Sequence, residues 1–246
     1  MGKGFGFREF TVSHDRCGMK VGTDSVLLGS WAKSPESHVR SILDIGTGTG
    51  ILALMMAQRC PEAQVCGVEI DHDAFLQASE NAGSSKFRKR IRLCLCDFRT
   101  FTSERKYDVI ISNPPFFSKD SRTINALANQ EERGRYTARH TDSLPFRELV
   151  AGAKRLLSGD GFFSVIVPCD SALDLIGICA ENDLYLTRRC DVRDSPDKDL
   201  KRCMMTFSHK IVQTELSLLS IHDESGAYSD EFRRLTGAFY LPAVFT

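Results

Sequence analysis

The tetrapeptide Asn113-Pro114-Pro115-Phe116 combines groups that suit the binding of a planar amine. It follows the apolar run 107–112, which predicts a strand. The two prolines lack N–H donors and hold φ near about −65°, so the backbone leaves the strand stiffly with unpaired carbonyl oxygens. The Asn113 side-chain oxygen and the Pro114 carbonyl can accept both hydrogens of an exocyclic amine while Phe116 stacks on its ring. An ordinary Asn-Pro turn with a packed phenylalanine is the alternative.

A glycine-rich segment, residues 43–50, lies between a predicted strand at 41–45 and a predicted helix at 51–58. Gly46 and Gly48 allow a backbone to approach a ligand closely, and the following helix offers free N–H groups. The spacing of the glycines is one residue shorter than in the dinucleotide-binding fingerprint. The segment therefore favours S-adenosylmethionine, which has no pyrophosphate, and a purely structural turn is the alternative.

Acidic residues follow the next two predicted strands. Glu69 lies 19 residues beyond Gly50, where a carboxylate can accept hydrogen bonds from the ribose hydroxyls of a nucleoside. Asp71 is an alternative ribose partner, and Asp97 could accept from an adenine amine. Because ligands of open α/β sheets bind outside the carboxyl ends of the strands, we expect these acids to meet the glycine-rich turn and Asn113 at one edge.

The elements that position these residues alternate along the chain. Strands are predicted near 41–45, 64–69, 91–96, 107–112 and 162–167, and helices near 51–59, 72–82, 144–157 and 170–182. This alternation predicts a parallel sheet with crossover helices. The β-rich runs 184–192 and 201–210 predict a hairpin that adds an antiparallel strand at the sheet edge, and residues 223–246 predict a partly helical tail.

From about residue 10 to residue 207 the chain resembles the class I S-adenosylmethionine-dependent methyltransferases that carry an Asn-Pro-Pro-aromatic motif. Residues 10–31 are similar to the start of the bacterial tRNA(Val) (adenine-N6) methyltransferases. The resemblance implies a Rossmann-like α/β fold, with a doubly wound, mostly parallel seven-stranded sheet and an antiparallel C-terminal hairpin strand. It also implies methylation of the N6 amine of the adenosine just 3′ of the anticodon, position 37, in tRNA(Val).

The resemblance also assigns residues to the site. Lys20, Thr23 and Asp24 belong to a segment that closes over the cofactor beside its methionine end. The other cofactor-binding residues that it implies are Asp44, Gly46, Gly48, Glu69 and Asp97. Residues 113–116 would hold the target base, so the implied catalytic residues are Asn113, Pro114, Pro115 and Phe116.

Residues 117–142 show no strong hydrophobic period, and loops of this length in a compact domain are usually functional. Basic and aromatic side chains in this loop suit contact with the phosphates and bases of single-stranded RNA. The predicted RNA-binding residues are Arg122, Arg133, Arg135, Tyr136 and Arg139. Residues 86–90 form a second basic cluster, and a solvated loop is the alternative for both segments.

Length and composition fit a single domain over residues 1–246. The resemblance implies that it is a methyltransferase domain with an N-terminal cofactor-covering segment (1–40), a catalytic core (41–212) and a C-terminal tail (213–246). Lys plus Arg and Asp plus Glu both number 32, so net charge gives RNA binding no support. No apolar stretch approaches the roughly 20 residues of a membrane span, and no cluster has metal-ligand spacing. We expect a cytoplasmic monomer without a metal, whose partner is the tRNA anticodon loop.

Other functions remain open at this point. An rRNA guanine-N2 methyltransferase is the nearest competitor, because those enzymes share the Asn-Pro-Pro-aromatic motif and can be compact. An NAD-dependent oxidoreductase would share the glycine-rich turn and the ribose acid, but the spacing of the third glycine argues against it. A noncatalytic RNA-binding module on the same fold is the third alternative.

Overall fold

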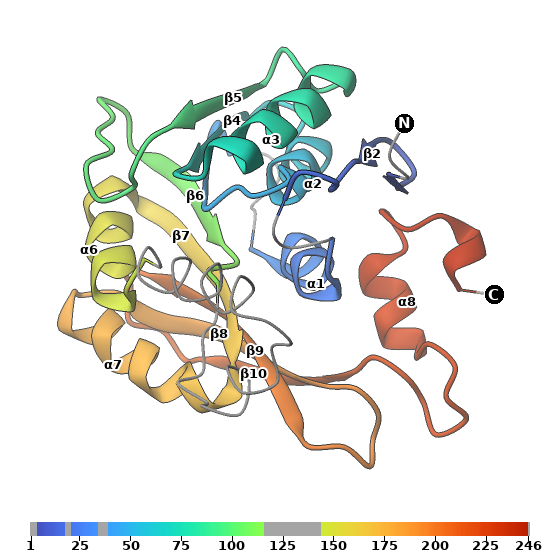
Figure 1. The fold of residues 1–246 in the computed structure, drawn as a ribbon. Coiled ribbons are helices and arrows are strands. Elements are labelled where there is room, and N and C mark those ends of the chain that lie inside the picture. The colour runs from blue at the N-terminus through green and yellow to red at the C-terminus, as the bar shows by residue number, and fades with distance from the viewer. Residues whose placement is uncertain (1–3, 18–20, 34–38, 116–143, 246) are drawn as a thin grey trace, which may run out of the picture.

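The computed structural model describes residues 4–17, 21–33, 39–115 and 144–245. Its centre is an eight-stranded sheet with helices on both faces (Figure 1). The strand order is β10-β8-β9-β7-β6-β3-β4-β5. The bounds are β3 Ser41–Ile45, β4 Gln64–Glu69, β5 Ile91–Leu95, β6 Tyr107–Ser112, β7 Leu157–Pro168, β8 Tyr185–Arg193, β9 Leu200–Ser208 and β10 Glu215–Ser220. A separate two-stranded sheet pairs β1 (Phe5–Gly6) with β2 (Thr11–Val12).

The parallel strands in the middle of the sheet bring their carboxyl ends to one edge. Ile45 at the end of β3 is in register with Val68 on β4 and with Ser112 on β6. From β3 the chain proceeds to β4 and β5 on one side, and β6 then returns to the other side of β3. The strand order therefore reverses between β3 and β6, which is where open α/β sheets bind their ligands.

Helices pack on both faces of the sheet because side chains along each central strand alternate between two apolar clusters. One face carries α6 (Phe146–Leu156) and α7 (Ala172–Glu181), and its cluster includes Leu43, Ile110 and Phe163. The other face carries α1 (Thr23–Trp31), α2 (Ile51–Arg59) and α8 (Asp230–Thr236). Helix α3 (His72–Ser84) lies over β4 and β5 on the same side as α2 (Figure 1). The doubly wound arrangement is thus confirmed.

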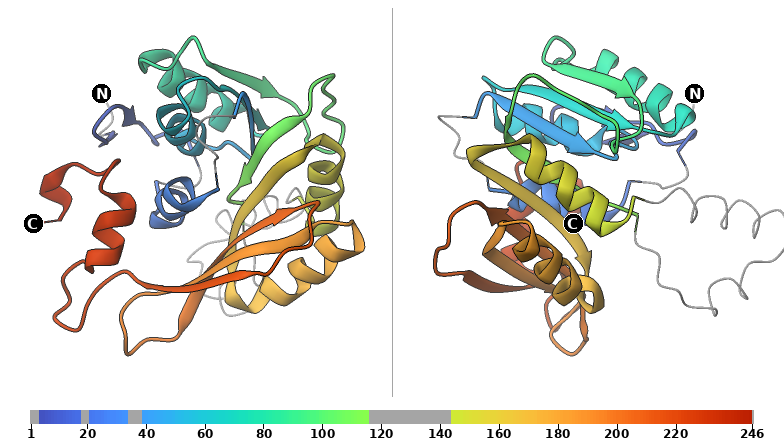
Figure 2. Two further views of the ribbon diagram at one scale, coloured as in Figure 1. Left: turned by 180° about the vertical axis from the view of Figure 1, so that it is seen from behind. Right: turned by 90° about the vertical axis from the view of Figure 1, so that its left-hand side faces the viewer.

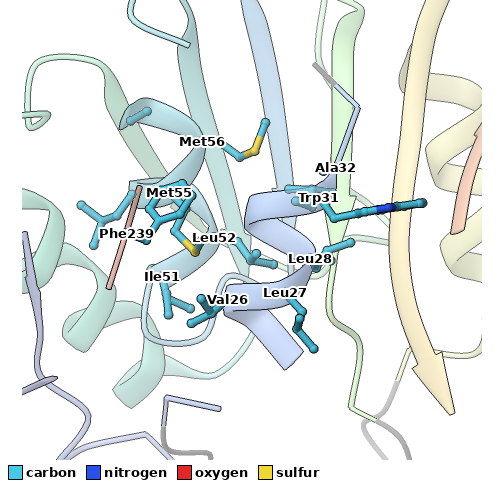
Figure 3. Close-up of a cluster of buried hydrophobic side chains, with 14 of the residues drawn as sticks. Val26, Leu27, Leu28, Trp31, Ala32, Ile51, Leu52, Met55, Met56 and Phe239 are labelled. Carbon is cyan, nitrogen blue, oxygen red and sulfur yellow. The ribbon is translucent and has the colours of Figure 1, made fainter. Parts of the chain in front are cut away.

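Helix α1 is a core element that the sequence did not reveal. Val26, Leu27 and Leu28 are consecutive and completely buried, so the helix has no polar face and no clear helical period. It packs closely against α2, since a Cβ atom added at Gly29 would lie 2.6 Å from the Sδ atom of Met55 (Figure 3). The N-terminal segment therefore supplies part of the core as well as any cover for a ligand.

The C-terminal region differs from the prediction in two respects. The antiparallel strand β9 is not at the sheet edge but between β7 and β8, and the described sheet has eight strands rather than seven. The additional strand β10 runs parallel to β8. It was missed because most of its side chains are exposed, so it lacks the alternation of buried and exposed residues that marks a strand.

The C-terminal segment packs against the N-terminus. The Arg8 side chain donates hydrogen bonds to the carbonyls of Gly237 and Tyr240 at 2.7 and 2.9 Å. The Phe7 ring stacks on the Tyr240 ring, and the left view of Figure 2 shows both ends of the chain on the same side of the molecule. The predicted tail is therefore divided between the sheet, through β10, and a helical cap that joins the cluster around α1.

Candidate active site at the carboxyl edge of the sheet

The turn between β3 and α2 has a backbone that only glycine adopts readily. Gly46 and Gly50 have φ values of 69° and 82°. A Cβ atom at Gly46 would meet nothing within 4 Å, whereas one at Gly50 would lie 3.3 Å from the Cβ atom of Ala78 on α3. Gly50 thus also allows α2 and α3 to pack closely, and the exposed Gly46 leaves room for a ligand beside the turn.

Asp44 is completely buried beneath this turn. Its Oδ2 atom accepts hydrogen bonds from the Thr47 hydroxyl at 2.6 Å and from the Ala53 N–H at 3.2 Å. Its Oδ1 atom has no hydrogen-bond partner among the described residues. Burial raises the pKa of Asp44 to about 7, and the neighbouring Glu69 carboxylate contributes in the same direction. A buried acceptor without a partner fits contact with a cationic or hydrogen-bond-donating ligand.

Glu69 connects the end of β4 to the glycine-rich turn. Its Oε2 atom accepts from the Gly48 N–H at 2.7 Å, and its Oε1 atom accepts from the N–H groups of Ile70 and Asp71, both at 2.9 Å. Burial raises the pKa of Glu69 despite these three hydrogen bonds. A carboxylate has about four lone-pair sites, so Glu69 can still accept from a ligand hydroxyl.

The alternative ribose partner, Asp71, has a structural role. Its Oδ1 atom accepts from the Ala74 N–H at 2.8 Å, so Asp71 is the N-cap of α3. Ile70 lies between the two acids and is 49% exposed, which is unusual for a large apolar side chain at the end of a buried strand. Ile70 was not singled out from the sequence, and it offers an apolar surface beside Glu69 for a flat ring.

Asp97 follows β5 at the same edge, but its carboxylate already has a cationic partner. The Arg99 side chain donates to Oδ2 from Nε at 2.7 Å, and the Arg99 N–H donates to Oδ1 at 2.9 Å. The hydrogen bond from the Arg99 side chain holds the pKa of Asp97 below its usual value. Asp97 could therefore accept from an adenine amine only through its remaining lone pairs.

Asn113 follows β6 on the other side of the point where the strand order reverses. Because Ile45 and Ser112 are in register, Gly46 and Asn113 each follow the last paired residue of neighbouring strands. The Asn113 Nδ2 atom donates to the Oγ atom of Ser25 at 3.0 Å, which leaves its Oδ1 atom as an acceptor. Pro114 is buried and Pro115 is half-buried, while Phe116 lies outside the described residues.

The start of α1 lies at this edge as well. Asp24 forms an ion pair with the Nε atom of Arg202 at 2.8 Å, and Arg202 is in register with Pro168 at the end of β7. Thr23 is exposed at the first position of α1, and Lys20 lies outside the described residues. Neither Ser25 nor Arg202 was expected here, because no local pattern indicates contacts across 88 and 178 residues.

The segment before α1, residues 13–17, packs against α3 beside Glu69. The Ser13 N–H donates to the side-chain oxygen of Asn81 on α3, and the Asn81 amide nitrogen donates to the carbonyls of Ser13 and Thr49. Burial raises the pKa of the Cys17 thiol to about 12, with Glu69 as the next contribution. Residues 13–17 therefore run along α3 toward Glu69 and the glycine-rich turn.

The structure describes only one of the two segments that were predicted to contact RNA. Arg122, Arg133, Arg135, Tyr136 and Arg139 lie outside the described residues. The basic cluster 86–90 precedes β5 and so lies at the amino edge of the sheet, opposite the candidate site. Its Arg90 guanidinium donates to three backbone carbonyls, of Ala57, Cys60 and Ala63, which indicates a structural role.

None of the described helices is long and apolar enough to cross a membrane. In the part of the chain that the structure describes, no three or more His, Cys, Asp or Glu side chains are grouped so that they could hold a metal ion.

Comparison with known proteins places the sequence among methyltransferases. Residues 18–131 match the family described as the methyltransferase small domain. A relative from Yersinia enterocolitica is 41% identical over 98% of this chain and 93% of its own length. A relative from Phocaeicola vulgatus is 42% identical over 96% of this chain and 97% of its own length. Both relatives are named tRNA1(Val) (adenine(37)-N6)-methyltransferase.

Solved structures show the same fold at low sequence identity. A predicted O-methyltransferase from Agrobacterium tumefaciens has a TM-score of 0.64 and 19% identity, over 87% of this chain and 96% of its own. The glycopeptide N-methyltransferase MtfA in complex with S-adenosylmethionine has a TM-score of 0.55 and 11% identity, over 80% of this chain and 98% of its own. The fold is that of the class I methyltransferases, as the motifs had indicated.

Proposed function

Because the chain belongs to the tRNA1(Val) (adenine(37)-N6)-methyltransferase family, we propose that it transfers a methyl group to the N6 amine of adenosine 37 in tRNA1(Val). The methyl donor is S-adenosylmethionine. One structural observation supports this proposal most strongly. Asn113 and Pro114 leave β6 beside the glycine-rich turn, so an amine-binding group and a nucleoside-binding turn meet where the strand order reverses.

The described residues of this edge fit S-adenosylmethionine. We propose that Asp44, Gly46 and Gly48 bind its methionine end and that Glu69 binds its ribose. Asp97 would contact the adenine, with Ile70 against the ring. The partnerless Oδ1 atom of Asp44 and the open space at Gly46 support this assignment. Thr23, Asp24 and Lys20 would close over the methionine end. When bound there, S-adenosylmethionine supplies a methyl group on a positively charged sulfur.

Asn113 and Pro114 would prepare the target amine for transfer. The Asn113 Oδ1 atom and the Pro114 carbonyl accept its two hydrogens, which favours a tetrahedral nitrogen whose lone pair is no longer shared with the ring. These hydrogen bonds strengthen as positive charge develops on the nitrogen. Pro115 and Phe116 would hold the adenine ring in place. The chain needs no strong base, because the proton can leave to water after transfer.

The RNA must present its base outside the stack. Turning adenosine 37 out of the anticodon loop costs a few kcal/mol, less than in a duplex. We propose that Arg122, Arg133, Arg135, Tyr136 and Arg139 bind the surrounding RNA, in which case affinity falls steeply as salt concentration rises. We also propose that the protein acts as a single-domain monomer in the cytoplasm, where tRNA is found.

The function is tested with RNA from a strain that lacks the gene. Purified protein is incubated with that RNA and methyl-labelled S-adenosylmethionine, and the RNA is then digested to nucleosides and separated. We expect label in N6-methyladenosine carried by tRNA1(Val), and none in a tRNA1(Val) transcript in which guanosine replaces adenosine 37. Label in N2-methylguanosine of rRNA would instead support the guanine methyltransferase, and no incorporation would support a noncatalytic RNA-binding module.

A further inference from the structure

We propose that Ser25 is a positioning residue that holds the Asn113 side chain in the rotamer that faces the target amine. This inference rests on the proposed function, because it concerns the group that would bind the target amine. Ser25 was not among the residues that the sequence motifs indicated, and it lies 88 residues before Asn113 in the chain.

The Asn113 side chain has two torsion angles, and only some of its rotamers bring Oδ1 to the target amine. One end of the amide carries an oxygen that accepts hydrogen bonds, and the other end carries an NH2 group that donates them. The Asn113 Nδ2 atom donates to the Oγ atom of Ser25 at 3.0 Å, which ties the side chain to α1 and leaves Oδ1 for the substrate.

Ser25 can perform this role because the helix that carries it is held firmly. The next three residues, 26–28, are completely buried against α2 and the sheet (Figure 3). At the far end of the helix, the guanidinium of Arg188 lies 4.4 Å from the centre of the Trp31 ring. The preceding residue, Asp24, is tied to Arg202 on β9. Ser25 therefore holds Asn113 from a rigid support, with a side chain that has a single rotatable carbon–carbon bond.

The expected size of the effect follows from the strength of one hydrogen bond. Without the Ser25 hydroxyl, the Asn113 side chain can leave the productive rotamer. A single side-chain hydrogen bond corresponds to roughly a fivefold to tenfold change in such an equilibrium. The methyl-transfer step should therefore slow by at most about that factor, because only the chemical step depends on the position of the amide.

The test compares Ser25→Ala with a matched variant, Ser30→Ala, on the same helix. Ser30 is also half-buried, and its buried Oγ atom has no hydrogen-bond partner among the described residues. The single-turnover rate constant for methylation of tRNA1(Val) should fall about twofold to tenfold in Ser25→Ala and remain unchanged in Ser30→Ala. The dissociation constant for S-adenosylhomocysteine and the melting temperature should be nearly equal in all three proteins. Ser25→Thr keeps the hydroxyl and should recover most of the rate.

A second comparison asks whether Ser25 acts through Asn113. In Asn113→Ala, there is no amide left to position. Adding Ser25→Ala to Asn113→Ala should therefore slow transfer less than it slows the wild type. An equal loss in both backgrounds would overturn the inference, as would an unchanged rate in Ser25→Ala or a loss of S-adenosylhomocysteine affinity as large as the loss of rate. If the wild type itself forms no N6-methyladenosine, it is the proposed function that fails, independently of these variants.

Discussion

The two halves of the candidate site are built in different ways. The half around β3 and β4 depends on contacts between residues close in the chain: Thr47 bonds to Asp44 three residues away, and Gly48 bonds to Glu69 across 21 residues. The half around Asn113 depends on distant contacts: Asn113 bonds to Ser25 across 88 residues, and the helix that carries Ser25 is tied to Arg202 by the neighbouring Asp24 across 178 residues. The first half would bind the methyl donor, and the second half would hold the methyl acceptor.

This difference predicts that substitutions can alter donor binding and amine positioning separately. The part of the donor half around Asp44 and Glu69 lies within one β-α-β unit, β3-α2-β4. The acceptor half joins α1 to β6, and α1 is in turn tied to β9 through Asp24. Substitutions in the donor half should change cofactor affinity or stability, and substitutions in the acceptor half should change the rate of transfer.

The largest effect is expected for Asn113→Ala in the acceptor half. It removes the acceptor that strengthens as charge develops on the amine, and loss of one such group typically costs about 100-fold to 1,000-fold in rate. We expect a decrease of that size in the single-turnover rate constant. The dissociation constant for S-adenosylhomocysteine, measured by calorimetry, should stay within about twofold of the wild type. Near-normal turnover in Asn113→Ala would contradict the proposed role of Asn113.

The free energy of unfolding should depend on pH through Asp44, which belongs to the donor half. Its pKa is about 7 in the folded chain and near the ordinary value of 3.8 in the unfolded chain. Between these values the folded state binds more protons, so raising the pH weakens the fold, by about 2–3 kcal/mol between pH 5 and pH 8.

Asp44→Asn has no proton to lose at this position. Its free energy of unfolding, from urea titrations without ligand, should therefore lack that decrease, and the advantage of the variant over the wild type should grow from pH 5 to pH 8. Parallel pH profiles for the two proteins would contradict the assignment of the shift to Asp44.

A smaller effect separates the two acids after β4. Glu69→Ala removes the carboxylate proposed to bind the ribose, and we expect S-adenosylhomocysteine to bind about 30-fold more weakly, or about 2 kcal/mol. Asp71→Asn is the control, because asparagine caps a helix as well as aspartate does, and affinity should hardly change. Melting curves would confirm that Glu69→Ala is folded at the temperature of the titration. Equal weakening in both variants would show that Asp71 shares the ribose contact.

Local sequence patterns were sufficient for the central sheet and the donor half. The predicted helix at 51–59 coincides with α2, and the predicted strands at 41–45, 64–69 and 107–112 coincide with β3, β4 and β6. The reason is that apolar periodicity and glycine-rich turns depend on residues within one or two elements. The sequence also determined the order of the motifs, and with it the resemblance to the family.

The tertiary structure alone decided which distant residues complete the acceptor half. The apolar residues of helix α1 are consecutive and show no helical period, so its sequence does not show that its first turn would reach Asn113. Strand β10 is mostly exposed, and only its pairing with β8 makes it part of the sheet. Asp24 gained a partner on β9 because that strand lies next to β7 rather than at the edge. Contacts of this kind depend on how separate elements pack, which no short stretch of sequence encodes.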